Sequence, residues 1–128
     1  MVRVAVFLPG LTNEWCLIDC VLDTGAGTTC VHPIDALGRL GLGAATLAEG
    51  MPGRRERHRG VGGGALYHVV PARYGLLDEH NEWLILEGML RIAEMTPENR
   101  TLPSILGWDV LRRFAVALDW PQRLVELR

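Results

Sequence analysis

The sequence predicts a single all-β domain over residues 1–128 with one or two short helices, and three observations support this. Fifteen Gly and seven Pro, with only 22% charged residues, indicate many turns between short elements. Short apolar runs bounded by these turn residues recur along the chain, which is typical of strands. A hydrophobic content of 48% lets a chain of this length bury one core without disulfide or metal crosslinks.

The N-terminal part of the chain predicts a hairpin that leads directly to an aspartate. Residues 2–8 (VRVAVFL) predict a strand that ends at Pro9-Gly10, and residues 14–22 (EWCLIDCVL) predict its partner. Side chains alternate between the two faces of a strand, so every second residue of the partner shares one face. The residues on its expected core face are Cys16, Ile18, Cys20 and Leu22.

The remaining elements follow from the positions of glycine, proline and apolar residues. The segment 82–94 fits either a buried strand or a helix, because its apolar run is continuous. The segment 105–114 starts as a strand, turns at Gly107 and continues with helical spacing. The other expected elements are a strand over 29–32, a helix of about two turns over 33–42, a strand over 44–51, two strand-like arms over 54–77 around a glycine tip (Gly60, Gly62, Gly63, Gly64), and a hairpin over 115–127.

Charge and cysteine content limit the classes of partner and compartment. The formal net charge of −2 argues against a general nucleic-acid binder, because binding the phosphate backbone needs a basic excess. Three cysteines without a disulfide-framework spacing indicate a reducing, cytoplasmic setting. The N-terminal apolar run is too short for a secretion signal, and no stretch approaches the roughly 20 apolar residues that span a bilayer. We therefore expect neither nucleic-acid nor membrane binding.

The segment LDTGAGTTC (22–30) places a carboxylate where a predicted strand leaves the core. Gly25 and Gly27 allow tight backbone turns after Asp23, and Ala26 adds little bulk. A carboxylate in such a cramped loop has a protonation state that its neighbours can tune. The simpler interpretation is a turn in which Asp23 accepts a hydrogen bond from its own backbone, and this segment alone favours that interpretation.

Two further segments favour a functional carboxylate over the simple turn. The sequence Asp23-Thr24-Gly25-Ala26 after a strand, a glycine-rich tip at 60–64, and Ile105-Leu106-Gly107 before a short helix occur in this order. Together they resemble the retropepsin-like family of aspartic proteases, specifically a bacterial, stand-alone domain of this family. The resemblance implies a closed β-barrel or sandwich with a flap hairpin. It also implies an aspartic endopeptidase that acts on peptide or protein substrates as a homodimer, without a metal or cofactor.

The resemblance assigns roles to individual positions. It implies that Asp23 is the catalytic aspartate, that the Thr24 hydroxyl braces the two active-site loops across the dimer, and that Gly25 lets the substrate backbone approach. The remaining substrate-binding positions that it implies are Ala26 and Gly27 beside the cleft, Gly62 and Gly63 at the flap tip, and Ile105 and Leu106, which with Gly107 lie beneath the active-site loop.

The chemistry of this family needs two aspartates, and the chain has one Asp-Thr-Gly. In aspartic proteases two aspartates about 3 Å apart share a proton, because both cannot ionise there. The ionised carboxylate takes a proton from water while the acid protonates the substrate carbonyl oxygen. The resemblance therefore implies an isologous homodimer with Asp23 of each subunit at the two-fold axis.

Gly27 departs from the family pattern, in which Ser, Thr or Asp often supports the catalytic carboxylate. Gly27 has no side chain to do this, and Thr28 and Thr29 are the candidates to replace it. The alternative interpretation is a catalytically weak or inactive protease-like module that dimerises or binds peptides.

Two other patterns allow more than one interpretation. The run RRERHR (54–59) predicts a solvated, charged edge that resists aggregation, or else a preference for acidic peptides through electrostatic steering. The residues Cys16, Cys20, Cys30 and His32 have a spacing unlike familiar zinc sites. Buried free thiols are therefore the favoured interpretation for the cysteines. Trp83, Trp108 and Trp120 are expected to anchor the core or an interface.

Overall fold

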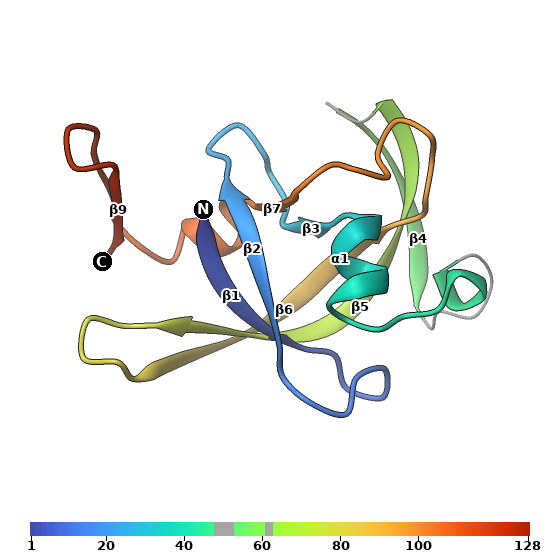
Figure 1. Cartoon of the computed structure of the whole chain (residues 1–128), viewed down its shortest axis with the longest axis horizontal. Helices are drawn as coiled ribbons and strands as arrows, with labels where there is room; N and C mark the ends of the chain where they lie inside the picture. The colour runs from blue at the N-terminus through green and yellow to red at the C-terminus, as the bar shows by residue number, and fades with distance from the viewer. Residues whose placement is uncertain (48–52, 61–62) are drawn as a thin grey trace.

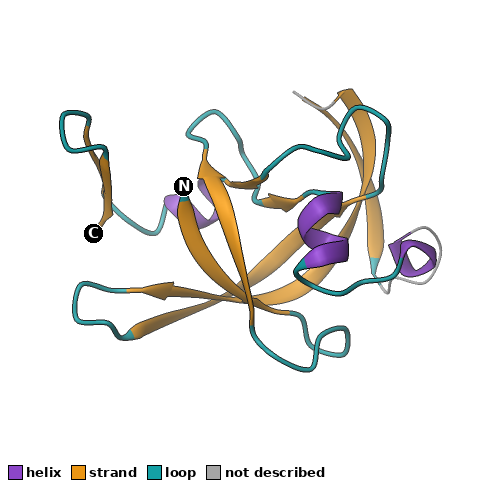
Figure 2. Cartoon of the chain, in the orientation of Figure 1, coloured by secondary structure: helices purple, strands orange, loops and turns teal. Residues whose placement is uncertain are grey.

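The computed structural model describes residues 1–47, 53–60 and 63–128. Within these ranges the chain is mostly β with short helices, which confirms the predicted fold class at that level (Figure 2). The strands are β1 (Val2–Phe7), β2 (Cys16–Leu22), β3 (Cys30–Val31), β4 (Arg54–Gly60), β5 (Gly63–Leu77), β6 (Trp83–Ala93), β7 (Ser104–Leu106), β8 (Val116–Asp119) and β9 (Leu124–Leu127). The labelled helices are α1 (Pro33–Gly38) and α2 (Trp108–Leu111), and residues 44–47 are also helical.

The main sheet closes on itself into a barrel (Figure 1). Its strands are hydrogen-bonded in the order β1-β2-β7-β3-β6-β5, and β1 pairs with β5 as well as with β2. These six strands form a ring, and β4 continues the sheet beyond β5. Closure leaves no free edge in the ring, because every strand in it has two partners.

The first hairpin has the predicted form. Gly10 adopts a positive φ of 80° in the turn, a conformation that glycine adopts without steric cost. Antiparallel pairing then sets Val4 opposite Ile18. Ile18 and Cys20 are buried while Leu17 is exposed, so the predicted alternation of β2 is confirmed.

The order β2-β7-β3 determines where Asp23 lies. Strand β7 pairs parallel with β2, with Leu22 opposite Leu106, and antiparallel with β3, with Cys30 opposite Ile105. The loop of residues 23–29 therefore leaves one neighbour of β7 and returns to the other. As a result, the segment after Asp23 crosses the end of β7, which the chain reaches only some eighty residues later.

The ambiguous segment 82–94 is a strand. Strand β6 pairs antiparallel with β5 along its whole length, from Leu77 opposite Trp83 to Tyr67 opposite Ala93. It also pairs in parallel with β3, where Cys30 lies opposite Arg91. The long strand β5 supplies a partner for every residue of β6, and this tertiary pairing decides against the helix.

Two sequence predictions differ from the structure. The strand expected over 44–51 is wrong for residues 44–47, which are helical, and 48–51 lie outside the described residues. Helix α1 begins at Pro33, as predicted, but ends at Gly38 rather than at 42. Gly41 has a φ of 68°, which is incompatible with continuing the helix. No helix of the described residues is long and apolar enough to cross a membrane.

The core fills the barrel and continues beneath both helices. Ala36 of α1 and Val110 and Leu111 of α2 pack against the same cluster as the barrel strands. The largest fully buried apolar side chains are Leu8, Ile18, Leu90, Ile92, Leu106 and Leu111. Helix α2 is thus fixed against the barrel directly after β7, which holds its N-terminal residues beside the Asp23 loop.

The C-terminal segment forms the predicted hairpin as a separate two-stranded sheet. Strands β8 and β9 pair from Val116 opposite Leu127 to Asp119 opposite Leu124. Figure 1 shows this hairpin beside the barrel and away from its body. Several of its apolar side chains are exposed as a result.

Candidate active site

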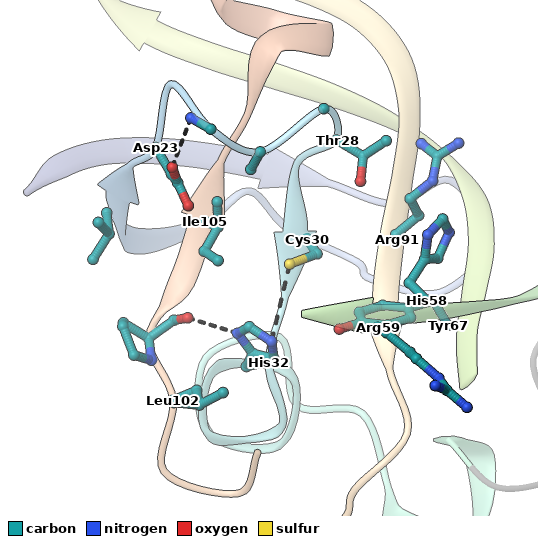
Figure 3. Close-up of a pocket in the computed structure, with 15 residues that line it drawn as sticks. Asp23, Thr28, Cys30, His32, His58, Arg59, Tyr67, Arg91, Leu102 and Ile105 are labelled. Atoms are coloured by element: carbon teal, nitrogen blue, oxygen red, sulfur yellow. Dashed lines mark hydrogen bonds between the residues drawn. The ribbon is translucent and has the colours of Figure 1, made fainter. Parts of the chain in front are cut away.

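Asp23 lies at the end of β2 in a tight turn. Its carboxylate Oδ1 accepts a hydrogen bond from the Gly25 amide at 2.8 Å (Figure 3), and its carbonyl accepts one from the Ala26 amide at 3.2 Å. The turn predicted by the simpler interpretation is therefore present. It occupies only Oδ1, and Oδ2 has no hydrogen-bond donor in the part of the chain that the structure describes. No ion pair within the described ranges involves this half-buried carboxylate.

The loop after Asp23 is hydrogen-bonded to β7 and the start of α2. The Asp23 amide donates to the Leu106 carbonyl at 3.1 Å, and the Trp108 amide donates to the Ala26 carbonyl at 2.9 Å. The Asp109 amide donates to the Gly27 carbonyl at 3.2 Å. The backbone of the loop is thus held at several points, which fixes the position of the carboxylate.

Thr29 and Asp109 join the loop to α2 through their side chains. Asp109 Oδ1 accepts from the Thr29 amide at 2.8 Å and from the Thr29 hydroxyl at 2.6 Å. The Thr29 hydroxyl oxygen in turn accepts from the Gly107 amide at 2.9 Å. Thr29 is buried, so the structure assigns this threonine to bracing the loop from beneath.

Gly107 permits the close approach of the loop to β7. A Cβ at this position would lie 2.6 Å from both the carbonyl carbon and the oxygen of Thr28, and 3.0 Å from the Ala26 oxygen. These are backbone atoms that cannot move without displacing the loop. The glycine after Ile105-Leu106 is therefore required by packing against the Asp23 loop.

A cavity of about 480 Å³ opens beside Asp23. The predicted site residues that line it are Asp23, Gly25, Ala26, Gly27 and Ile105. Leu106 is fully buried in the core, and Thr24 is exposed at the tip of the loop. Gly63 begins β5, and Gly62 lies outside the described residues.

Several cavity-lining residues were not predicted from the sequence. Thr28, already a candidate to support the carboxylate, lines one wall of the cavity. Cys30 and His32 follow it at alternating positions, so the period-two pattern of the segment after Asp23 could have indicated them. The opposite wall comes from strands β4 to β6, which contribute Tyr67, Arg91 and, from the basic run at 54–59, His58 and Arg59. No local pattern pointed to Tyr67 or Arg91, because pairing between distant strands brings them together.

His32 and Cys30 are polar groups within the otherwise apolar part of the cavity wall. His32 Nδ1 lies 2.6 Å from the Pro103 carbonyl oxygen, which only accepts, so Nδ1 carries a proton. His32 Nε2 lies 4.0 Å from Cys30 Sγ (Figure 3). Burial, followed by the negative charge of Asp109, raises the pKa of the Cys30 thiol to about 11. Cys30 is therefore a protonated thiol near neutral pH rather than a nucleophilic thiolate.

Glu56 organises the positive charges on the β4–β6 wall. Its Oε2 lies 2.7 Å from His58 Nε2 and accepts from Arg91 Nε at 3.0 Å, while Oε1 lies 2.9 Å from the Arg54 guanidinium. The His58 hydrogen bond, followed by the Arg91 interaction, lowers the pKa of Glu56 to about 2. Glu56 is ionised at neutral pH and holds His58 and Arg91 in place.

None of the three tryptophans expected to anchor the core or an interface is in the core. Trp83 is 50% exposed and Trp120 is 86% exposed. Trp108 is 40% exposed and donates its indole hydrogen to the Thr24 carbonyl. The core part of that prediction is wrong, because these side chains lie on the β5–β6 tip, at the start of α2 and in the β8–β9 turn, outside the barrel.

Comparison with known proteins adds no identification. No protein-family model matches the chain, and no curated protein matches it in sequence.

Proposed function

We propose that the protein is an aspartic endopeptidase whose active form is a homodimer. The observation that carries the proposal is the Asp23 carboxylate, held in a braced Asp-Thr-Gly loop at the edge of the cavity. Only one of its oxygens is occupied by the loop's own backbone. The order of Asp-Thr-Gly-Ala, the β4–β5 hairpin and Ile-Leu-Gly resembles that of retropepsin-like proteases.

The mechanism requires a second carboxylate. With two Asp23 side chains sharing one proton, the ionised carboxylate removes a proton from a water molecule, and the water oxygen attacks the peptide carbonyl carbon. The protonated carboxyl donates its proton to the carbonyl oxygen. Collapse of the resulting tetrahedral adduct breaks the carbon–nitrogen bond as a proton passes to the leaving amine. One copy of the chain supplies only one of these two groups.

The surface around the loop tip is available to a second copy. Thr24 and Gly25 are exposed, and Trp108 lies partly exposed beside them. The β8–β9 hairpin adds a second apolar region, in which Leu118 is 68% exposed and Trp120 is 86% exposed. Contact with a copy of this chain would bury both regions and bring the two Asp23 loops together at a two-fold axis.

The β4–β5 hairpin favours a peptide substrate bound in an extended conformation. Its arms pair from Arg54 opposite Val69 to Gly60 opposite Gly63, and its residues His58, Arg59 and Tyr67 line the cavity. A peptide bound between this hairpin and the Asp23 loop would pair its backbone with the cleft and place alternate side chains in pockets.

Gly27 supports a second candidate function, a peptide-binding or dimerisation module without turnover. A Cβ at Gly27 would meet no heavy atom within 4 Å, so the space that a supporting side chain would occupy is open. Thr29, one of the two candidates to replace it, is already engaged with Asp109 and Gly107. Peptide binding without cleavage from acidic to neutral pH would favour this second function.

The test is cleavage of a peptide library, read by mass spectrometry, with wild-type protein and Asp23→Asn. We expect wild-type protein to release products and Asp23→Asn to release none above background, because Asn can neither accept nor share the catalytic proton. Asp78→Asn, on an exposed turn between β5 and β6, is the matched control and should cleave like wild type. Equal cleavage by wild type and Asp23→Asn would reject the mechanism.

A further inference from the structure

The cavity has two ends of opposite charge (Figure 3). The Asp23 carboxylate lies at one end, and Arg91 and His58 lie on the opposite wall. Asp23 is assigned to the chemistry, whereas the basic wall has no role in the mechanism proposed above.

The basic wall carries more positive than negative charge. Glu56 is the carboxylate that contacts it, and this one negative charge is shared by Arg54, Arg91 and His58. Arg59 lines the cavity and forms no ion pair within the described ranges. Permanent positive charges therefore outnumber the negative one, even with His58 neutral.

Arg91 is positioned to bind an anion. Its side chain is only 15% exposed, and Glu56 fixes it through Nε at 3.0 Å. The terminal NH₂ groups of Arg91 have no acceptor among the residues that the structure describes. A guanidinium held in this way loses little conformational entropy when it binds a carboxylate.

Two hydroxyl groups on the same cavity are also without partners in the described part of the chain. They belong to Thr28, in the Asp23 loop, and to Tyr67 on β5. Each can donate to an acceptor. The group that satisfies a guanidinium and neighbouring hydroxyls together is a carboxylate, which accepts several hydrogen bonds through two oxygens.

We propose that this basic wall, through Arg91, His58 and Tyr67, forms with Thr28 of the facing wall a specificity subsite for an acidic side chain of the substrate, next to the bond that is cut. This inference rests on the proposed peptidase and names the substrate class of that site. The subsite favours a carboxylate over a phosphate dianion, because the Glu56 charge lies against both His58 and Arg91 and repels a second negative charge.

The experiment uses peptides that are identical except at one position, which carries Glu, Gln or phosphoserine in turn on either side of the scissile bond. Cleavage of each peptide by wild-type protein gives kcat/KM. Binding of the same peptides to Asp23→Asn, measured by calorimetry, gives Kd without turnover. At one position we expect Glu to exceed Gln at least about tenfold in both measurements, because only Glu forms the charge-assisted hydrogen bonds.

Three variants test which residue is responsible. In Arg91→Gln the Glu-to-Gln ratio should fall to about one, while the Gln peptide is still cleaved. Arg91→Lys keeps a charge beside Glu56 and should retain part of the preference, which distinguishes loss of the charge from loss of the fold. Arg57→Gln removes an exposed arginine of β4 that does not line the cavity, and should keep the wild-type ratio.

The outcomes separate this inference from the proposed function. Cleavage with no difference between Glu and Gln, or a difference that survives in Arg91→Gln, overturns the subsite and leaves the peptidase standing. Absence of cleavage, with Arg91-dependent tighter binding of the Glu peptide, supports the subsite and rejects the peptidase. A preference for phosphoserine over Glu overturns the carboxylate assignment in favour of a phosphate.

Discussion

The Asp23 carboxylate closes a local turn through Oδ1, while Oδ2 has no hydrogen-bond donor among the described residues. Its Oδ1 closes the turn onto Gly25, while the loop backbone is bonded to Leu106 and the start of α2. Asp23 and the glycines around it were evident from the sequence because they are adjacent. Tyr67 and Arg91 were not, because only the pairing of β5 with β4 and β6 brings them to the cavity.

At the residue scale, the interactions of Glu56 predict a contribution to folding stability that depends on pH. Its pKa is lowered from 4.5 to about 2 in the folded state. Its interactions therefore contribute full stability above about pH 4.5, and this contribution is lost as the pH falls towards 2, because the unfolded chain binds the proton first. In Glu56→Gln this pH-dependent part of the stability should be absent.

The measurement is urea unfolding of wild type and Glu56→Gln at a series of pH values from 7 down to 3. The difference in unfolding free energy should shrink as the pH falls below about 4.5. Glu79→Gln, at an exposed position, controls for the loss of one negative charge. A difference that does not change with pH would show that Glu56 is not held by His58 and Arg91 in solution.

At the element scale, turn residues and period-two alternation predicted the hairpins, and long-range pairing decided the rest. Pro9-Gly10 and the alternation of β2 were sufficient to place the first hairpin. The segment 82–94 was ambiguous because an apolar run fits two structures, and its partner β5 made it a strand. The strand expected from 44 failed at 44–47, where the described residues are helical instead.

Substitution of Gly107 tests the packing of the Asp23 loop against β7 and α2. In Gly107→Ala the new Cβ would lie 2.6 Å from the Thr28 carbonyl group, so the loop must move. We expect the unfolding free energy to fall by about 1–3 kcal/mol, the usual cost of overpacking. Peptide cleavage should fall as well, because the loop positions Asp23.

Gly38→Ala is the matched control for Gly107→Ala. A Cβ at Gly38 meets nothing within 4 Å, and the residue ends α1 without a positive φ. Denaturant unfolding should therefore show little change or a small gain for Gly38→Ala. Equal stability of the Gly107→Ala and Gly38→Ala proteins would contradict the packing account.

At the scale of the whole molecule, the proposed dimer accounts for surface that the barrel leaves uncovered. The β8–β9 hairpin exposes Leu118 and Trp120, and the loop tip exposes Thr24. The resemblance to retropepsin-like proteases implied a dimer, but the sequence did not show which apolar residues stay outside the core. The structure leaves Leu118 and Trp120 exposed because the barrel closes without the β8–β9 hairpin.

Leu118→Glu should weaken assembly without unfolding the chain. Leu118 is 68% exposed, so the substitution costs little in the single copy, whereas a charge in an apolar contact between copies is unfavourable. Sedimentation should show a higher monomer fraction, and cleavage per subunit should fall most in dilute protein. Ile34→Glu, at an exposed position of α1, should assemble like wild type. Unchanged assembly of Leu118→Glu would exclude the hairpin from the interface.

The central claim is that two Asp23 carboxylates, one from each copy, form one active centre. It is tested most directly by mixing wild-type and Asp23→Asn subunits at fixed total concentration, allowing exchange, and measuring peptide cleavage. If each centre needs Asp23 from both copies, the rate falls as the square of the wild-type fraction, to about a quarter at equal mixing. A rate that falls in direct proportion, to about half, would mean that each chain acts alone and would contradict the account.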